Sequence, residues 1–290
     1  MDCYLCGSTN VTLITEKLRY DYNMKAYKCE NCSLYFLYPK MTPEEENAFY
    51  EKEYGKIYRA EKNTSLQDLF ESRFNSGDVK LYYELTKPYL SKEDNCFEAG
   101  AACGYFLAKI KNDVKLVSGS ESHIEMREYA DKIGIKMVES LSDVQENSID
   151  KFFMFFLLEH LGNPIVYLKT VYRLLKKGGK LFILVPNVDD ALFTVYKIPG
   201  FVSFYFTPAH PHYFSKKTLS EVIKKSGFDD FEVQYLQRYD LSNHMCWLAT
   251  GKPGGLGKYS DFFTDELLSE YSRCLISHGN SDTLWAVVTK

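Results

Sequence analysis

Between residues 79 and 185 short apolar runs alternate with longer amphipathic segments, and this alternation constrains the fold more than any other feature of the chain. The apolar runs lie at 96–99, 114–119, 135–138, 149–155 and 180–185, with helical patterns at 79–90, 104–112, 124–133 and 164–176. Strands separated by helices of this length form parallel sheets. We therefore predict a doubly wound, Rossmann-like α/β sheet, which binds ligands at the carboxyl ends of its strands.

The first of these strands runs directly into a cluster of very small residues. The stretch from Cys96 to Phe106 reads CFEAGAACGYF, in which an acid precedes a Gly/Ala turn and a helical pattern. Missing side chains at such a turn let backbone N–H groups approach a ligand. The same turn also arises from packing alone, so the loop by itself leaves cofactor binding and packing as equal alternatives.

A second acid, Glu121, follows Gly100 by 21 residues and stands at the tip of the next strand. A carboxylate at this place accepts hydrogen bonds from both hydroxyls of a ribose. A solvated acid after a strand is the alternative interpretation. The interval between the loop and the acid favours the ribose.

Four of the eight cysteines form two C-x-x-C pairs separated by 22 residues, with short strand patterns at 11–14 and 26–28 between them. This spacing is typical of a zinc ribbon. Four thiolates complete a tetrahedral Zn²⁺ site and leave no open position, so we predict a structural metal. Unligated cysteines and a redox pair are the weaker alternatives. The predicted ligands are Cys3, Cys6, Cys29 and Cys32.

A helix is expected to begin at Thr42-Pro43, where three glutamates follow the proline. If it continues, Tyr50, Tyr54 and Tyr58 form a stripe on one face, which either packs against the next domain or edges a substrate pocket. Residues 60–77 are polar, and residues 75–78 carry a loop signal.

Composition limits the possible partners. The net charge is −4, and residues 1–40 carry five basic against four acidic side chains, which argues against nucleic acid as a partner. No apolar run reaches the length of a bilayer, and Met1-Asp2-Cys3 does not begin a signal peptide. We expect a cytoplasmic protein with no membrane contact.

Four motifs in order resemble those of the class I S-adenosylmethionine-dependent methyltransferases, namely residues 98–106, 119–122, 156–161 and 174–187. The resemblance implies seven strands in the order 3-2-1-4-5-7-6, with residues 231–235 and 284–289 as the last antiparallel hairpin. It also implies that the loop holds the methionine end of the cofactor, that Glu121 and Ser122 hold the ribose, and that Phe155 packs on adenine. The loop residues are Glu98, Gly100, Ala101, Ala102 and Gly104.

The cysteine-rich start and the segment His210-Pro-His212-Tyr-Phe-Ser215 are similar to methyltransferases of sugar, surface-polysaccharide and natural-product pathways. This resemblance implies a small-molecule, saccharide-type acceptor methylated on oxygen or carbon. Two positions depart from the pattern. Ala102 replaces a usual glycine, and Phe156 stands where some relatives carry a second acid for a metal, so no catalytic magnesium is expected.

The expected organisation is a zinc ribbon at 1–40, a helical linker at 41–78 and the S-adenosylmethionine-binding domain at 79–290. An aromatic lid is expected around 188–214 and an insertion around 239–282.

Methyl transfer needs an aligned nucleophile and one base, and histidine suits that role near neutral pH. We predict a base among His160, His210 and His212, with His244 as a further candidate, whereas His123 and His278 read as solvated. RNA base methylation and a non-catalytic cofactor-binding module are the alternatives; a Rossmann dehydrogenase fits the motifs poorly.

Overall fold

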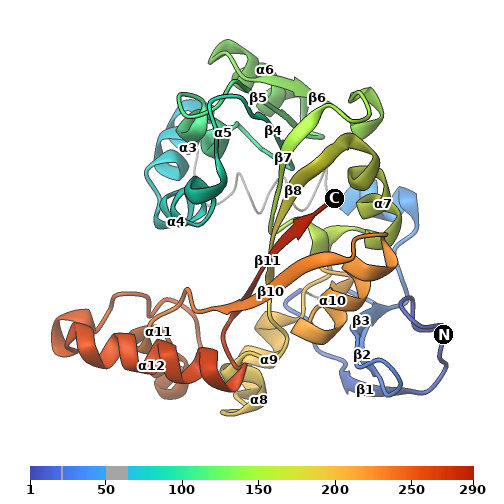
Figure 1. Cartoon of the computed structure of the whole chain (residues 1–290). Helices are drawn as coiled ribbons and strands as arrows, with labels where there is room; N and C mark the ends of the chain where they lie inside the picture. Colours follow the sequence, from blue (N-terminus) through green and yellow to red (C-terminus); the bar gives the residue numbers. More distant parts are fainter. Residues whose placement is uncertain (21, 50–64) are drawn as a thin grey trace.

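The structure is a computed structural model that describes residues 1–20, 22–49 and 65–290. The tyrosine stripe expected at Tyr50, Tyr54 and Tyr58 lies outside the described residues. Two sheets organise the chain, a central one of seven strands and a smaller one of four (Figure 1).

The central sheet confirms the predicted α/β architecture. Its strand order is β10-β11-β8-β7-β4-β5-β6, which is the expected order 3-2-1-4-5-7-6 read from the other edge. All neighbours pair in parallel except β11, which runs antiparallel to both β8 and β10. The strands are β4 (Asn95–Ala99), β5 (Leu116–Ser120), β6 (Lys136–Val138), β7 (Ile149–Phe155), β8 (Leu175–Pro186), β10 (Asp230–Leu236) and β11 (Thr283–Thr289).

Alternate side chains of the central strands point to opposite faces and bury two apolar layers. Phe152 packs with Phe97 in one layer, together with α7 (Pro164–Leu174) and α10 (Lys216–Lys225). Phe153 packs in the other layer, together with α4 (Gly77–Thr86) and α5 (Tyr105–Ile110). This core holds the carboxyl ends of the parallel strands in register.

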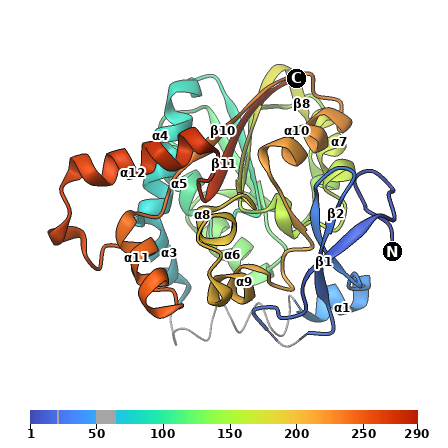
Figure 2. The same cartoon turned by 90° about the horizontal axis from the view of Figure 1, so that it is seen from below.

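The second sheet joins the N-terminal segment to a distant part of the chain. Its order is β1 (Val11–Thr15), β2 (Lys25–Cys29), β3 (Tyr35–Tyr38) and β9 (His212–Tyr213). Tyr35 pairs with Tyr213, and Phe36 pairs with His212. Leu34 and Phe36 belong to the same buried cluster as the central strands, so the N-terminal segment shares the main core. In Figure 2 the small sheet, in blue, lies beside the α/β body.

Residues 60–77 are polar and belong to the predicted helical linker at 41–78, with a loop signal at residues 75–78. Helix α3 (Leu66–Phe74) occupies most of the described part of this segment. Ser65 and Asp68 form a capping box, and Phe70 stacks on Phe74 with ring centroids 5.6 Å apart. Capping and one apolar ridge outweigh the polar composition.

Two helical insertions cover the carboxyl edge of the sheet. The first lies between β8 and β9 and contains α8 (Ala191–Thr194) and α9 (Pro199–Tyr205). The second, between β10 and β11, contains α11 (Leu241–Thr250), η5 (Ser260–Phe262) and α12 (Asp265–His278), and it projects from the body of the molecule (Figure 1).

Short elements complete the described chain: α1 (Pro43–Ala48), η2 (Lys87–Tyr89), α6 (Ile124–Lys132), η3 (Leu141–Asp143) and η4 (Leu158–His160). Among the described residues, no helix is both long and apolar enough to cross a bilayer.

Candidate functional site

A cavity of about 980 Å³ lies at the carboxyl ends of β4, β5, β7 and β8, where a doubly wound sheet binds its ligands. The glycine loop and the tip of β5 form part of its wall, and η4, α4, α9 and α11 contribute further side chains. The predicted cofactor loop and two of the predicted histidines therefore share one cavity.

The loop after β4 adopts the backbone conformations that its small residues permit. Gly100 has φ +68°, Gly104 has φ +76° and Ala102 has φ +47°. Gly100 and Ala102 line the cavity, whereas Ala101 is buried beneath it. A Cβ on Gly104 would lie 3.0 Å from the Ile135 side chain, so this glycine serves packing against the protein.

Glu121 is tied to the loop by a direct hydrogen bond. The backbone N–H of Ala102 donates to its Oε2 at 3.0 Å, and the N–H of His123 donates to its Oε1, also at 3.0 Å. Burial alone would raise the pKa of Glu121, but the hydrogen bonds from His123 and Ala102 lower it below its ordinary value. The acid is therefore ionised at the cavity wall, next to Ser122.

His123 was expected to be solvated, and the structure corrects this. It is half-buried, lines the cavity and lies with Nδ1 3.1 Å from Glu121 Oε1. His278 is exposed as expected.

Glu98 lies buried under the loop, and its Oε2 has no hydrogen-bond partner. Burial and then the charge of Glu121 raise the pKa of Glu98 well above its ordinary value. Glu98 therefore carries a neutral carboxyl group near the end of β4, just before the loop.

An aromatic wall follows β7. Phe155 stacks on Tyr82 with centroids 4.3 Å apart and planes at 25°. Phe156 has φ +52°, and the Arg238 guanidinium lies 4.4 Å from its ring centroid. Both phenylalanines line the cavity, and they offer flat apolar faces to a ligand.

His160 of η4 meets His210 from the segment before β9. Their ring centroids are 4.5 Å apart, and the planes are nearly perpendicular at 86°. Burial lowers the pKa of His160 to about 4. Burial, and then the charge of His160, lower the pKa of His210 well below its ordinary value. Both imidazoles are therefore neutral near pH 7.

Glu159 completes this cluster, and no role was predicted for it from the sequence. One ligand atom from each of Glu159, His160 and His210 lies within 4.8 Å of the others. The Glu159 side chain is buried, and neither carboxyl oxygen accepts a hydrogen bond from another described residue. Burial raises the pKa of Glu159 to about 8.

The other predicted histidines lie outside the cavity wall. His212 stacks on Tyr4 with centroids 4.2 Å apart, and its Nε2 lies 3.4 Å from the Gly162 carbonyl oxygen. His244 lies on α11 with Nδ1 2.7 Å from the Tyr271 hydroxyl. Both are buried within the protein.

Several further lining residues were not predicted as site residues from the sequence, although some lie in the predicted aromatic lid around 188–214 and in the predicted insertion around 239–282. Arg238 follows β10 at the ligand-binding edge and pairs with Asp78 at 2.6 Å. This pairing could not be seen in the sequence, because the partner is 160 positions away. The others come from the N-terminal segment and the insertions: Arg19, Asp190, Phe201, Phe204, Asn243 and Trp247.

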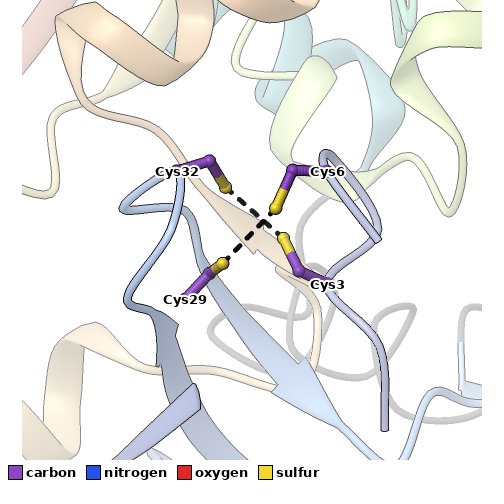
Figure 3. Close-up of side chains that lie close together, drawn as sticks. All are labelled: Cys3, Cys6, Cys29 and Cys32. Atoms are coloured by element: carbon purple, nitrogen blue, oxygen red, sulfur yellow. Dashed lines mark hydrogen bonds between the residues drawn. The ribbon is translucent and has the colours of Figure 1, made fainter. Parts of the chain in front are cut away.

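The four cysteines of the N-terminal segment converge as predicted, with their sulfur atoms within 4.8 Å of one another (Figure 3). The Cys3–Cys32 and Cys6–Cys29 sulfur atoms are 3.4 Å and 3.5 Å apart. A tetrahedral Zn²⁺ with Zn–S bonds of about 2.3 Å separates its sulfurs by about 3.8 Å. The cluster therefore has the composition and nearly the dimensions of a four-thiolate zinc site.

Comparison with known proteins agrees with this geometry. A family model described as a methyltransferase domain matches residues 70–233. An uncharacterised protein of Methanocaldococcus jannaschii is 29% identical over 138 residues, covering 47% of this chain and 64% of that protein. The chain thus spans less than two thirds of this curated relative.

Two solved structures are similar in fold. One is a SAM-dependent methyltransferase from Archaeoglobus fulgidus, with a TM-score of 0.52, 18% identity, and coverage of 78% of this chain and 100% of that one. The other is an S-adenosylmethionine-dependent methyltransferase from Mesorhizobium loti, with a TM-score of 0.50, 13% identity, and coverage of 75% and 100%.

Proposed function

Because the chain belongs to the methyltransferase domain family, we propose that it transfers the methyl group of S-adenosylmethionine to a small-molecule acceptor. The observation that carries this proposal is the placement of the Ala102–Glu121 hydrogen bond and the His160–His210 pair on the walls of one cavity. Glu121, held by the hydrogen bond, is suited to binding the methyl donor, and the histidine pair is suited to the methyl acceptor.

The residues at the loop fit the cofactor. Glu121 keeps an ionised carboxyl at the tip of β5, where ribose hydroxyls donate to it, with Ser122 beside it. Gly100 lines the cavity next to Leu157. Any side chain at this position would crowd Leu157, because a Cβ would lie 3.1 Å from the Leu157 side chain. Phe155 offers a face to the adenine. When bound, the cofactor supplies an activated methyl group on a sulfonium.

We assign the remaining chemistry to the histidine pair. The acceptor loses one proton as its nucleophilic atom bonds to the methyl group, and a neutral imidazole takes that proton. His160 donates a ring hydrogen bond to the Ala209 carbonyl, which orients it beside His210. His212 lies behind this pair, and we assign it a positioning role through β9.

We infer a saccharide-type acceptor, methylated on oxygen or carbon. The aromatic side chains of α9 and α11, including Phe201, Phe204 and Trp247, line the acceptor half of the cavity with Asn243 and Asp190. Flat rings with polar groups between them suit a ring that has both apolar faces and hydroxyl edges. The resemblance of residues 210–215 to sugar-pathway methyltransferases supports the same class.

We also propose that the four cysteines hold a structural zinc ion. Cys3, Cys29 and Cys32 are buried and belong to the main core, so the site has no open face for a substrate. In this role the ion joins the knuckle that precedes β1 to the knuckle that links the end of β2 to β3.

Calorimetric titration with S-adenosylmethionine tests the donor site. Wild-type protein is expected to bind one equivalent, and Glu121→Ala is expected to weaken binding at least tenfold because the ribose loses its acceptor. Glu146→Ala is the matched control, since Glu146 is an exposed acid paired only with Arg173 among the described residues. Equal affinity of the Glu121 variant and wild type would show that the ribose assignment is wrong.

A panel of hydroxyl and keto sugars, followed by S-adenosylhomocysteine release, tests the acceptor and the base. His210→Asn and His160→Asn are expected to lower turnover at least a hundredfold without changing donor affinity. Full turnover in both variants contradicts the histidine base.

A further inference from the structure

We infer that Glu159 is a catalytic carboxylic acid that stays protonated. It donates a hydrogen bond to an oxygen atom of the methyl acceptor, next to the position that the histidine pair deprotonates. This inference rests on the proposed function and narrows its acceptor class. It assigns a role to the one member of the cavity cluster that methyl transfer with a histidine base does not use.

The first argument is the exposure and hydrogen bonding of the carboxyl group. Glu159 is 1% exposed, yet its residue lines the cavity. Both Oε1 and Oε2 lack a hydrogen-bond partner from another residue in the described chain. A carboxylate deprived of water and of donors is strongly destabilised, whereas a carboxylic acid in the same place is tolerated.

The second argument is the set of charged and titratable groups around it. His160 on its own element and His210 from the segment before β9 are neutral and lie within the same cluster. Tyr205 and Tyr213 face it from α9 and β9, and burial raises the pKa of both phenols. No cationic side chain in this group of described residues pairs with Glu159.

Arg238 is the nearest candidate for a counter-charge, and its contacts lie elsewhere. Its Nη2 pairs with Asp78 at 2.6 Å, and its guanidinium covers Phe156. Its charge favours an ionised Glu159, but burial has the larger effect, and the pKa of Glu159 rises to about 8. At pH 7 the side chain therefore carries its proton.

A buried acid beside two neutral imidazoles is complementary to a pair of neighbouring functions on the acceptor. The acceptor atom bonds to the methyl group as the S–C bond breaks and its electron pair returns to sulfur. The acceptor's proton goes to an imidazole, and Glu159 keeps its own proton while bonding to the adjacent oxygen. The fitting class is a compound with a hydroxyl or carbonyl next to the reacting position, as on a sugar ring.

Infrared spectroscopy of the zinc-loaded protein tests the protonation state without an acceptor. We expect a protonated-carboxyl C=O band at pH 6–7 that disappears as the pH rises through about 8 and is absent in Glu159→Gln. Glu98→Gln and Asp190→Asn are the controls, because each removes another buried carboxyl of the cavity whose pKa is raised by burial. A folded wild type with no Glu159 band at pH 6–7 overturns the inference.

A pair of variants tests the role on the acceptor identified from the sugar panel. Glu159→Gln preserves a neutral donor of the same shape, so turnover is expected within tenfold of wild type, with the alkaline decline near pH 8 removed. Glu159→Leu removes the donor and is expected to lose at least a hundredfold. Loss of turnover in Glu159→Gln overturns the acid role in favour of a carboxylate base. Wild-type turnover that depends on added Mn²⁺ or Co²⁺ overturns it in favour of a metal ligand.

Titration with S-adenosylhomocysteine separates this inference from the proposed function. Both Glu159 variants are expected to bind it as wild type does, which also shows that they fold. Failure of wild type to bind it contradicts the proposed function itself, whatever the infrared result.

Discussion

Single side chains decide how the loop after β4 meets its ligand. Ala102 holds a left-handed backbone conformation at φ +47°, which costs an L-residue with a Cβ about 1–2 kcal/mol. The conformation persists because its N–H donates to Glu121. The loop thus stores strain at the point where the sequence departs from the usual glycine.

Replacing this residue with glycine is expected to stabilise the protein. Ala102→Gly should raise the free energy of unfolding by about 0.5–1 kcal/mol, because the relief of strain exceeds the entropy that glycine adds to the unfolded chain. Urea denaturation measures the change. Ala101→Gly is the control, because Ala101 is buried and has no positive φ, so it should destabilise. A loss of stability in Ala102→Gly would contradict the strain.

The buried histidines make stability depend on pH. The pKa of His160 falls to about 4 and that of His212 to about 3, both through burial, so the unfolded chain binds more protons than the folded chain below pH 6.5. Stability is expected to be complete above pH 6.5 and to fall by about 1.4 kcal/mol per unit for each such histidine as the pH drops toward 4.5. His212→Asn should make this slope shallower, whereas His278→Asn, at an exposed site, should not. An unchanged slope in His212→Asn would show that this histidine titrates normally.

Among the elements, those with strong local signals were predictable from the sequence. The strands from β4 to β8 follow apolar runs bounded by turns, and α7 differs from its prediction only by ending at Leu174. β9 was not predicted because two residues carry no periodicity, and its pairing with β3 depends on partners 176 and 178 positions earlier. Glu159 was visible inside a recognised motif, but its missing hydrogen bonds become apparent only when the surrounding elements are in place.

The pairing of β3 with β9 connects the cysteine cluster to the active-site wall. His212 and Tyr213 lie in this strand, two and three residues after His210. Removal of the proposed zinc ion should therefore loosen the segment that carries His210, since the knuckle before β3 loses its constraint.

Hydrogen exchange with zinc-loaded and chelator-treated protein measures this effect. Amides of residues 35–38 and 212–213 are expected to lose at least tenfold protection on zinc removal and in Cys29→Ser. The exposed Cys274 lies far along the chain on α12, so Cys274→Ser should retain one zinc per chain and full protection. Unchanged protection after complete loss of zinc would show that the metal does not support this sheet.

At the scale of the whole molecule, one buried cluster extends across both sheets. Leu34 and Phe36 of the N-terminal segment share a buried cluster with Phe214 and with Leu219 of α10. Packing therefore runs across residue 40, where the zinc ribbon is predicted to end. Stability should therefore be cooperative over both sheets.

Phe36→Ala tests this cooperativity. It should lower the free energy of unfolding by about 3–5 kcal/mol and still give a single transition. Fluorescence of Trp285 on β11 and of Trp247 on α11 should follow the same midpoint as circular dichroism. Leu13→Ala, which removes a side chain that is 44% exposed, should change stability by about 0.5 kcal/mol or less. Two separate transitions would contradict a shared core.

The junction between β3 and β9 also bears on how the chain is made. All four cysteines precede the central sheet in the chain, so the metal site can be complete before any strand of that sheet has been synthesised. The outer edge of β3, however, stays without its partner until residue 213 has been synthesised. While the residues between β3 and β9 are synthesised, that edge is an open template for foreign strands. Early metal capture would hold the small sheet in register during this interval, and the arrival of β9 would then close it.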